Sequence, residues 1–178
     1  MTIHDELVLE LLKPKKNGKI SRDAPIIEII GDAKIEYKLE ERLPFYPDAA
    51  SKRVERTEYM VPDVLITNRD EKKVAIEVEN DVGWDFGQSL RQVKKYLKKY
   101  DNTKIIIPKE YERFAPLYFN EGIEVHLWTA VRVWQCQTCG KKTESESKIQ
   151  PKCLDCNKKT QHQLEGVKEV KFEPYQAY

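Results

Sequence analysis

The fold of this chain is decided by residues 61–100, which read VPDVLITNRDEKKVAIEVENDVGWDFGQSLRQVKKYLKKY. Two strand-like runs, residues 61–67 and 73–79, are separated by a short polar turn, a pattern typical of an antiparallel hairpin. Residues 85–100 follow with apolar side chains every three or four positions, which predicts an amphipathic helix. The stretch therefore predicts a strand–strand–helix unit at the centre of an α/β fold.

Further elements are predicted on both sides of this unit. Other strand-like runs, rich in β-branched or aromatic residues, are residues 25–30, 34–39, 102–108 and 123–133. Amphipathic helices are predicted over residues 3–13 and 110–120, and residues 42–58 are polar and contain prolines, as a loop would be. The alternation of helices with strands predicts a mixed sheet with helices packed on its faces.

Composition excludes some classes of protein and leaves others open. The 178 residues carry 31 Lys or Arg and 30 Asp or Glu, a formal net charge of +1, so net charge favours no particular partner. No run approaches the roughly 20 consecutive apolar residues of a membrane span, and the N-terminus lacks the layout of a signal peptide. We therefore expect an intracellular, cytoplasmic protein without a membrane partner. The abundance of Lys, Glu and Ile points to a thermophilic source.

The cysteines form a pattern typical of metal sites. They occur as two Cys-x-x-Cys pairs and are Cys136, Cys139, Cys153 and Cys156. Two residues between paired thiolates allow one tight turn to aim both sulfurs at a common point, and two such turns complete a tetrahedral site. Gly140 and Asn157, which follow the pairs, tolerate the positive φ that such turns often require. The spacing predicts one structural Zn²⁺ with no open coordination position.

Two alternatives to zinc remain at this point. Two disulfides would fit poorly with an intracellular chain, whereas an iron–sulfur cluster would use the same four thiolates. On the zinc interpretation we expect two domains. A core would span residues 1–133, and a four-cysteine zinc ribbon with the C-terminal tail would span residues 134–178.

Acidic side chains cluster in the predicted hairpin. Glu77 and Glu79 project from one face of the second strand, because strand side chains alternate. Asp63, on the first strand, should approach them across the hairpin. Three clustered carboxylates repel one another unless a cation neutralises them, and oxygen ligands suit Mg²⁺ or Mn²⁺. The alternative is that Glu77 and Glu79 line the water-facing side of an antiparallel sheet.

The helix predicted over residues 85–100 has three kinds of surface. Its buried stripe is expected to comprise Leu90, Val93, Leu97 and Tyr100. Gln92 and Tyr96 lie one turn apart at the border of this stripe, where they can reach toward a cleft. The basic far side could contact the phosphates of a nucleic acid and comprises Arg91, Lys94, Lys95 and Lys98. The alternative is an ordinary surface helix with a lysine-rich exterior.

Three motifs follow one another along this stretch, namely Pro62-Asp63, Glu77-Val78-Glu79 and Gln92-x-x-x-Tyr96. In this order and placement they resemble the PD-(D/E)xK nuclease superfamily. The closest resemblance is to its branch with a Gln-x-x-x-Tyr motif, which includes the RecB-like exonucleases and the NucS-type mismatch endonucleases. The similarity covers residues 61–100, and the order of the elements extends it to about residue 133.

The resemblance implies a restriction-endonuclease-like core, a mixed sheet flanked by helices. Carried over by motif, the ligands of Mg²⁺ or Mn²⁺ would be Asp63 and Glu77, and the residues near the DNA backbone would be Gln92 and Tyr96. The family often adds an acid from its first helix, for which Glu10 is the candidate.

The chain departs from the family at one position. The family lysine, which helps to position or activate the attacking water, is replaced by Glu79. Glutamate in this position could act as a base or as an added metal ligand, but the lysine is also lost in members that no longer cleave. The candidates to substitute for it in space are Lys72, Lys73, Lys94 and Lys95.

The main hypothesis is a divalent-metal-dependent DNA nuclease that hydrolyses phosphodiester bonds. Its predicted catalytic residues are Asp63, Glu77, Glu79, Gln92 and Tyr96, with the three acids holding the metal. The first alternative is a catalytically inactive protein of the same fold that binds nucleic acid or acts as a scaffold. The second is a protein–protein adaptor, suggested by the near-zero net charge. DNA is the expected partner, RNA stays open, and a homodimer would suit this class of fold.

Overall fold

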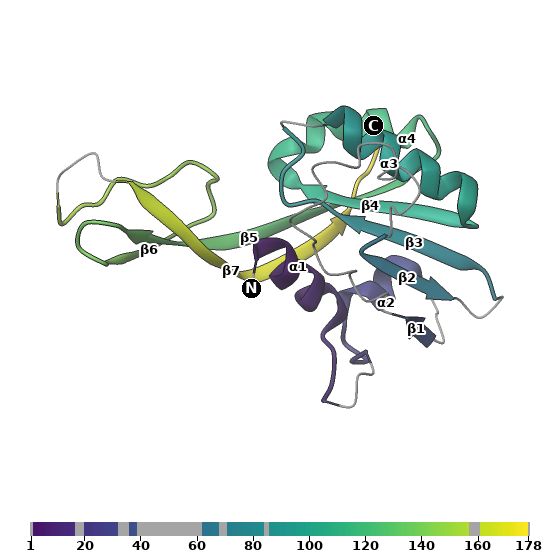
Figure 1. Cartoon of the computed structure of the whole chain (residues 1–178), viewed down its shortest axis with the longest axis horizontal. Helices are drawn as coiled ribbons and strands as arrows, with labels where there is room; N and C mark the ends of the chain where they lie inside the picture. The colour runs from purple at the N-terminus through teal and green to yellow at the C-terminus, as the bar shows by residue number, and fades with distance from the viewer. Residues whose placement is uncertain are drawn as a thin grey trace, which may run out of the picture.

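The computed structural model is a mixed α/β protein with a curled mixed sheet flanked by helices (Figure 1). The residues that it describes are 2–16, 20–31, 36–38, 62–67, 71–83, 86–156 and 161–177. The loop predicted over residues 42–58 and the turn residue Asn157 lie outside these ranges. No helix among the described residues is both long and apolar enough to span a membrane.

In the part of the chain that the structure describes, the sheet contains seven strands. They are β1 (Glu36–Lys38), β2 (Val64–Thr67), β3 (Lys73–Val78), β4 (Asn102–Pro108), β5 (Glu124–Cys136), β6 (Lys142–Ser145) and β7 (His162–Pro174). Strands β1, β2 and β3 form an antiparallel meander, whereas β3, β4 and β5 are parallel neighbours. The predicted hairpin is therefore confirmed. Strands β6 and β7 both run antiparallel to β5, on opposite edges of it.

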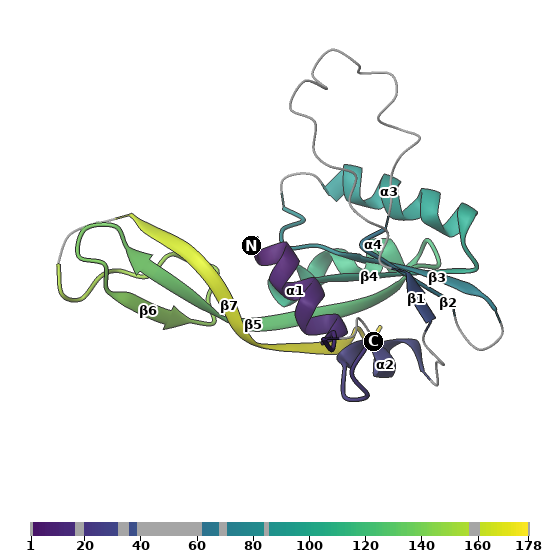
Figure 2. The ribbon, with the colours of Figure 1, turned by 60° about the horizontal axis from the view of Figure 1, so that its bottom comes forward.

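Helices cover both faces of the sheet (Figure 2). They are α1 (Ile3–Leu12) and α2 (Pro25–Ile30) on one face, and α3 (Phe86–Lys99), the 3₁₀ helix η3 (Lys109–Phe114) and α4 (Ala115–Phe119) on the other. Side chains of β3 alternate between these layers, so Ile76 and Val78 pack in the core beneath α1, while Ala75 packs in the core beneath α3. Glu77 shares the side of Ala75 and therefore points toward α3.

Residues 25–30 form helix α2, so the strand predicted there is wrong. Pro25 occupies the first turn, where its missing amide costs no hydrogen bond, and Gly31 ends the helix with a φ of 64°. Ile26 and Ile29, three positions apart, are both buried in the core beneath α1. Burial of one helical face therefore overrides the β-propensity of a run of isoleucines.

The single helix predicted over residues 110–120 is divided. Residues Lys109–Phe114 form the 3₁₀ helix, and α4 begins at Ala115 with Pro116 in its first turn. Proline lacks the amide that would continue an α-helix and clashes with the preceding turn, so a new helix has to begin at this point. Asn120 caps the C-terminal end of α4, and Gly122 follows with a φ of 79°.

The strand predicted to be the last, residues 123–133, is neither last nor complete. Strand β5 continues to Cys136, and β7 pairs with it from His126↔Pro174 to Cys136↔His162. Register shifts interrupt this pairing, so the apolar residues of β7 do not recur at a strict spacing of two. For this reason the sequence pattern did not predict β7 as a strand. Strand β5 crosses the boundary predicted between residues 133 and 134, and β7 pairs along it, so the two strands join the ribbon to the sheet (Figure 1).

Candidate functional site

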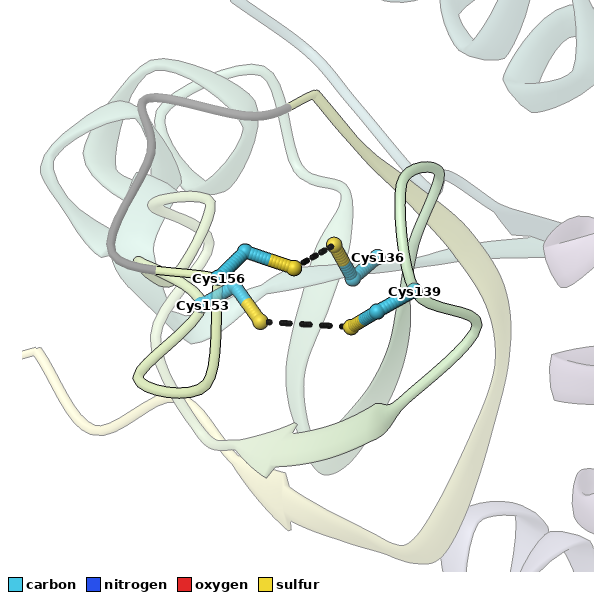
Figure 3. A group of neighbouring side chains, drawn as sticks. All are labelled: Cys136, Cys139, Cys153 and Cys156. Atoms are coloured by element: carbon cyan, nitrogen blue, oxygen red, sulfur yellow. Dashed lines mark hydrogen bonds between the residues drawn. The ribbon is translucent and has the colours of Figure 1, made fainter.

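The four cysteines gather at the tip of the ribbon (Figure 3). Their sulfur atoms all lie within 4.8 Å of one another, and the separations Cys136–Cys156 and Cys139–Cys153 are 3.9 and 3.6 Å. In a tetrahedral Zn–S₄ site with bonds of roughly 2.3 Å, sulfur atoms are roughly 3.8 Å apart. A disulfide would need roughly 2.05 Å, and all four thiols are free. The cluster is therefore compatible with one zinc ion, and the disulfide alternative is wrong.

The backbone around the first cysteine pair explains this convergence. The amide of Gly140 donates to the carbonyl of Cys136 (2.8 Å), and the amide of Cys136 donates to Lys141 (2.9 Å), which closes a tight turn at the end of β5. Gly140 has a φ of 74°, a backbone conformation that residues with a Cβ atom rarely adopt. Contact with the other thiols, Cys139 first, and burial raise the pKa of Cys156 to about 12. Such a cluster opposes thiolate formation unless a cation compensates the charge.

The acidic residues lie where β2 and β3 adjoin. Because Val64 is paired with Ile76, Asp63 falls opposite Glu77. The carboxylate of Asp63 accepts a hydrogen bond from the amide of Val78 (2.9 Å), and the amide of Asp63 donates to Glu77 at 3.4 Å. Glu77 is only 8% exposed. The interpretation of Glu77 as a residue on a water-facing side of the sheet is therefore wrong, because α3 covers that side.

Helix α3 presents the predicted glutamine and tyrosine directly to this carboxylate. The Gln92 amide donates to Glu77 (2.6 Å) and to the hydroxyl of Tyr96 (2.8 Å). Tyr96 is itself a hydrogen-bond partner of Glu77. The structure thus brings together Asp63, Glu77, Gln92 and Tyr96 from three elements that the sequence separates by up to 33 positions.

The buried stripe of α3 differs from the predicted one. Its buried side chains are Ser89, Val93 and Tyr96, whereas Leu90, Leu97 and Tyr100 are only partly buried. Tyr96 therefore lies in the core rather than at a border. The helix can bury Ser89 and Tyr96 because polar partners satisfy their hydroxyls, so a prediction from hydrophobicity alone misplaces the face.

Burial and mutual repulsion shift the titration of these acids. Burial raises the pKa of Glu77 well above its usual value, and the nearby charges of Asp63 and Glu79 raise it further. Burial also raises the pKa of Glu79, while Ser89 opposes this as a hydrogen-bond donor. The pKa of Tyr96 is raised by burial and then by Glu77, so its hydroxyl keeps its proton. A divalent cation would relieve the same repulsion.

Glu79 has its own set of contacts just after β3. Its amide donates to Ile106 (2.9 Å), and its carbonyl accepts from the indole of Trp128 (2.8 Å). Its side-chain partner Ser89 accepts a hydrogen bond from Tyr118 (2.9 Å), and both of these side chains are buried. The Glu79 carboxylate is therefore held by the buried Ser89, which Tyr118 contacts in turn, and the sequence motifs indicated neither residue.

Helix α1 contributes a histidine rather than the predicted acid. His4 approaches Asp63, with 3.0 Å between Nε2 and Oδ2, whereas Glu10 is exposed. The helix starts at a capping box formed by Thr2 and Asp5, which places His4 in the first turn. Helical spacing could have indicated that His4 faces inward, because it precedes the buried residues Leu7 and Val8 by three and four positions.

The predicted basic contacts lie away from the acids. Arg91, Lys95 and Lys98 are exposed on the side of α3 opposite its buried stripe. Lys94 forms an ion pair with Glu121 at 2.8 Å. Among the possible substitutes for the family lysine, Lys72 and Lys73 are exposed. The structure therefore does not bring these lysines to the acidic residues.

Among the described residues, the cysteines are the group of three or more His, Cys, Asp or Glu side chains gathered closely enough to hold one ion. Asp63, Glu77 and Glu79 do not form such a group in the described part of the chain, and internal donors contact the carboxylates of Asp63 and Glu77. Comparisons with protein-family models, with curated proteins and with solved structures find no match. The interpretation of the site therefore rests on the residues of this chain.

Proposed function

We propose that this protein is a divalent-metal-dependent nuclease that hydrolyses phosphodiester bonds in DNA. The observation that carries the proposal is the junction of Asp63 and Glu77 with Gln92 and Tyr96, linked by hydrogen bonds of 2.6 to 3.4 Å. The order of the secondary-structure elements also supports the proposal. A helix is followed by an antiparallel meander, a crossover helix and a parallel strand, as expected for a restriction-endonuclease-like core.

The proposed Mg²⁺ or Mn²⁺ ligands are Asp63, Glu77 and Glu79. Their carboxylate oxygens are the donors that these ions prefer. Burial, and after it the charge of neighbouring acids, raises the pKa of both glutamates, and a bound cation would favour their ionised forms. A bound ion would polarise the scissile phosphate and lower the pKa of a water molecule.

The chain's own side chains supply orientation and a proton acceptor. Gln92 and Tyr96 fix the carboxylate of Glu77, and Tyr96 acts as a donor because its pKa is raised. Glu79 stands where the family has lysine, and its raised pKa makes its carboxylate a stronger proton acceptor for the attacking water. The proposed zinc at the four cysteines is structural, because four thiolates leave no open position.

Cleavage of labelled single- and double-stranded DNA in Mn²⁺ or Mg²⁺ tests this function. Glu77→Gln should abolish cleavage, because the variant keeps the shape of the side chain and removes its charge. Glu10→Gln is the matched control, since Glu10 lies exposed on α1. Equal activity of wild type and Glu77→Gln would refute the assignment of the site.

A catalytically inactive nucleic-acid-binding protein of the same fold is the second candidate. It is favoured by two observations, the replacement of the family lysine by Glu79 and the internal hydrogen bonds that already occupy Glu77. This candidate predicts DNA or RNA binding in EDTA that weakens with salt, and no Mn²⁺-dependent product. Stoichiometric Mn²⁺ binding that is lost in Glu77→Gln would count against it.

A further inference from the structure

The zinc ribbon contacts the loop that leaves the acidic strand. After β3 the chain passes through residues 79–83, and Lys148, between β6 and Cys153, reaches this loop. Its ammonium lies 2.8 Å from Oδ2 of Asp81. The same ammonium contacts the hydroxyl of Tyr111 and lies 4.4 Å from the centroid of its ring. Residues 67 positions apart thus form one cluster.

Asp81 is held from three directions in this cluster. Its Oδ1 atom accepts hydrogen bonds from the Tyr111 hydroxyl (2.7 Å) and from the amide of Gly83 (2.8 Å), while Oδ2 faces Lys148. Gly83 has no room for a side chain, because a Cβ atom there would lie 2.9 Å from the Tyr111 hydroxyl. Tyr111 is only 9% exposed, so its side chain is held by the core and the loop packs against it.

The ribbon segment that carries Lys148 is anchored at both ends. Before Lys148, the carbonyl of Glu146 accepts a hydrogen bond from Arg132 of β5 at 2.7 Å. After it, Gln150 donates to the carbonyl of His162 at the start of β7 (2.8 Å). Cys153, a ligand of the proposed zinc, follows three residues later. The position of Lys148 therefore depends on the fold of the ribbon.

We propose that Lys148 is a positioning residue that, with Tyr111, clamps Asp81 and so fixes the loop following Glu79. For its effect on cleavage, this inference rests on the proposed function. Asp81 lies two positions after Glu79 in the same loop, which places the clamp beside the proposed proton acceptor. The ribbon is then a brace that orders one side of the acidic site, and a displaced ribbon would loosen the loop.

Hydrogen exchange of the zinc-loaded full chain tests the clamp directly. Lys148→Met should raise the exchange rate of the Gly83 amide about tenfold, because Asp81 loses the cation that holds it in place. Lys148→Arg should restore most of the protection, since guanidinium also pairs with carboxylate. Lys152→Met, at an exposed lysine of the same segment, is the control and should change neither the rate nor the zinc content.

Cleavage kinetics provide the second measurement. Lys148→Met should lower kcat about threefold to tenfold with KM unchanged, because Lys148 acts on the loop rather than on DNA binding. A higher KM at constant kcat would instead make Lys148 a phosphate contact and overturn the proposal. If the wild type does not cleave DNA, the proposed function fails, and exchange alone decides the clamp. Unchanged exchange at Gly83 in zinc-loaded Lys148→Met would refute it.

Discussion

Gln92 donates its side-chain amide to the buried carboxylate of Glu77 at 2.6 Å, so a polar contact joins α3 to β3 inside the core. Polar groups buried at such a junction are tolerated only when they satisfy one another. The contact therefore has a structural consequence that holds whatever the protein does.

Gln92→Ala should lower the free energy of unfolding by about 1–2 kcal/mol, because it removes the closest donor from a buried carboxyl group. Urea unfolding at constant pH measures this change. Lys95→Ala, at an exposed position of the same helix, should stay within about 0.5 kcal/mol of the wild type. Equal losses in both variants would show that the contact contributes nothing specific.

The stability of the protein should depend on pH through Glu77. Its pKa is raised in the folded state above the ordinary value of 4.5, chiefly by burial, so the folded state binds more protons than the unfolded state. The associated stability is complete below pH 4.5 and is lost as pH rises through the folded pKa. Glu77→Gln should therefore gain stability relative to wild type as pH rises.

Urea unfolding of both proteins between about pH 4.5 and 8 measures this difference. Parallel stability curves would contradict the raised pKa of Glu77. Added Mn²⁺ should flatten the wild-type curve at the alkaline end and leave the Glu77→Gln curve unchanged, because a cation bound at the acids favours the folded, ionised state.

Zinc should be stoichiometric and structural. Metal analysis of the purified chain is expected to find one zinc per chain, and Cys139→Ser should lose it and lower the melting temperature. Thr138→Ser, in the same turn, is the matched control and should keep the metal. Iron together with visible absorption would instead identify an iron–sulfur cluster.

Local patterns predicted the parts of the molecule that depend on neighbours in sequence. The antiparallel hairpin follows from two short strand-like runs around a turn, and the cysteine cluster follows from the spacing of two Cys-x-x-Cys pairs. The meeting of Asp63 with Glu77 follows from the hairpin alone. Each of these results needs only the period of a strand or the reach of a turn.

The remaining parts depend on contacts between distant segments. His4 reaches Asp63 from 59 positions away, and no local pattern indicates that α1 packs beside this hairpin. Tyr96 is buried because Gln92 and Glu77 satisfy its hydroxyl, which a hydrophobicity count treats as a penalty. Helix α2 was missed for a related reason, since its isoleucines form a helix only because the core beneath α1 accepts one face.

Ser89 should lower the pKa of Glu79, the proton acceptor of the proposed reaction. Its hydroxyl lowers the pKa of Glu79 by hydrogen bonding to the ionised carboxylate, against the larger effect of burial. Ser89→Ala removes this donor and should raise the pKa of Glu79 further. A base must be ionised to accept a proton, so the acid limb of the pH profile of kcat/KM should move to higher pH.

Tyr118→Phe should move the same limb in the same direction by a smaller amount. Tyr118 donates to Ser89 at 2.9 Å, and burial raises its pKa to about 12, so it remains a donor throughout the assay range and orients the serine toward Glu79. Titration of Glu79 by ¹³C NMR measures the pKa independently of catalysis, and Tyr175→Phe, outside this chain of contacts, is the control. If neither the acid limb nor the pKa of Glu79 changes in Ser89→Ala, Ser89 only fills space. The pKa of Glu79 would then be set by burial and by its other neighbours.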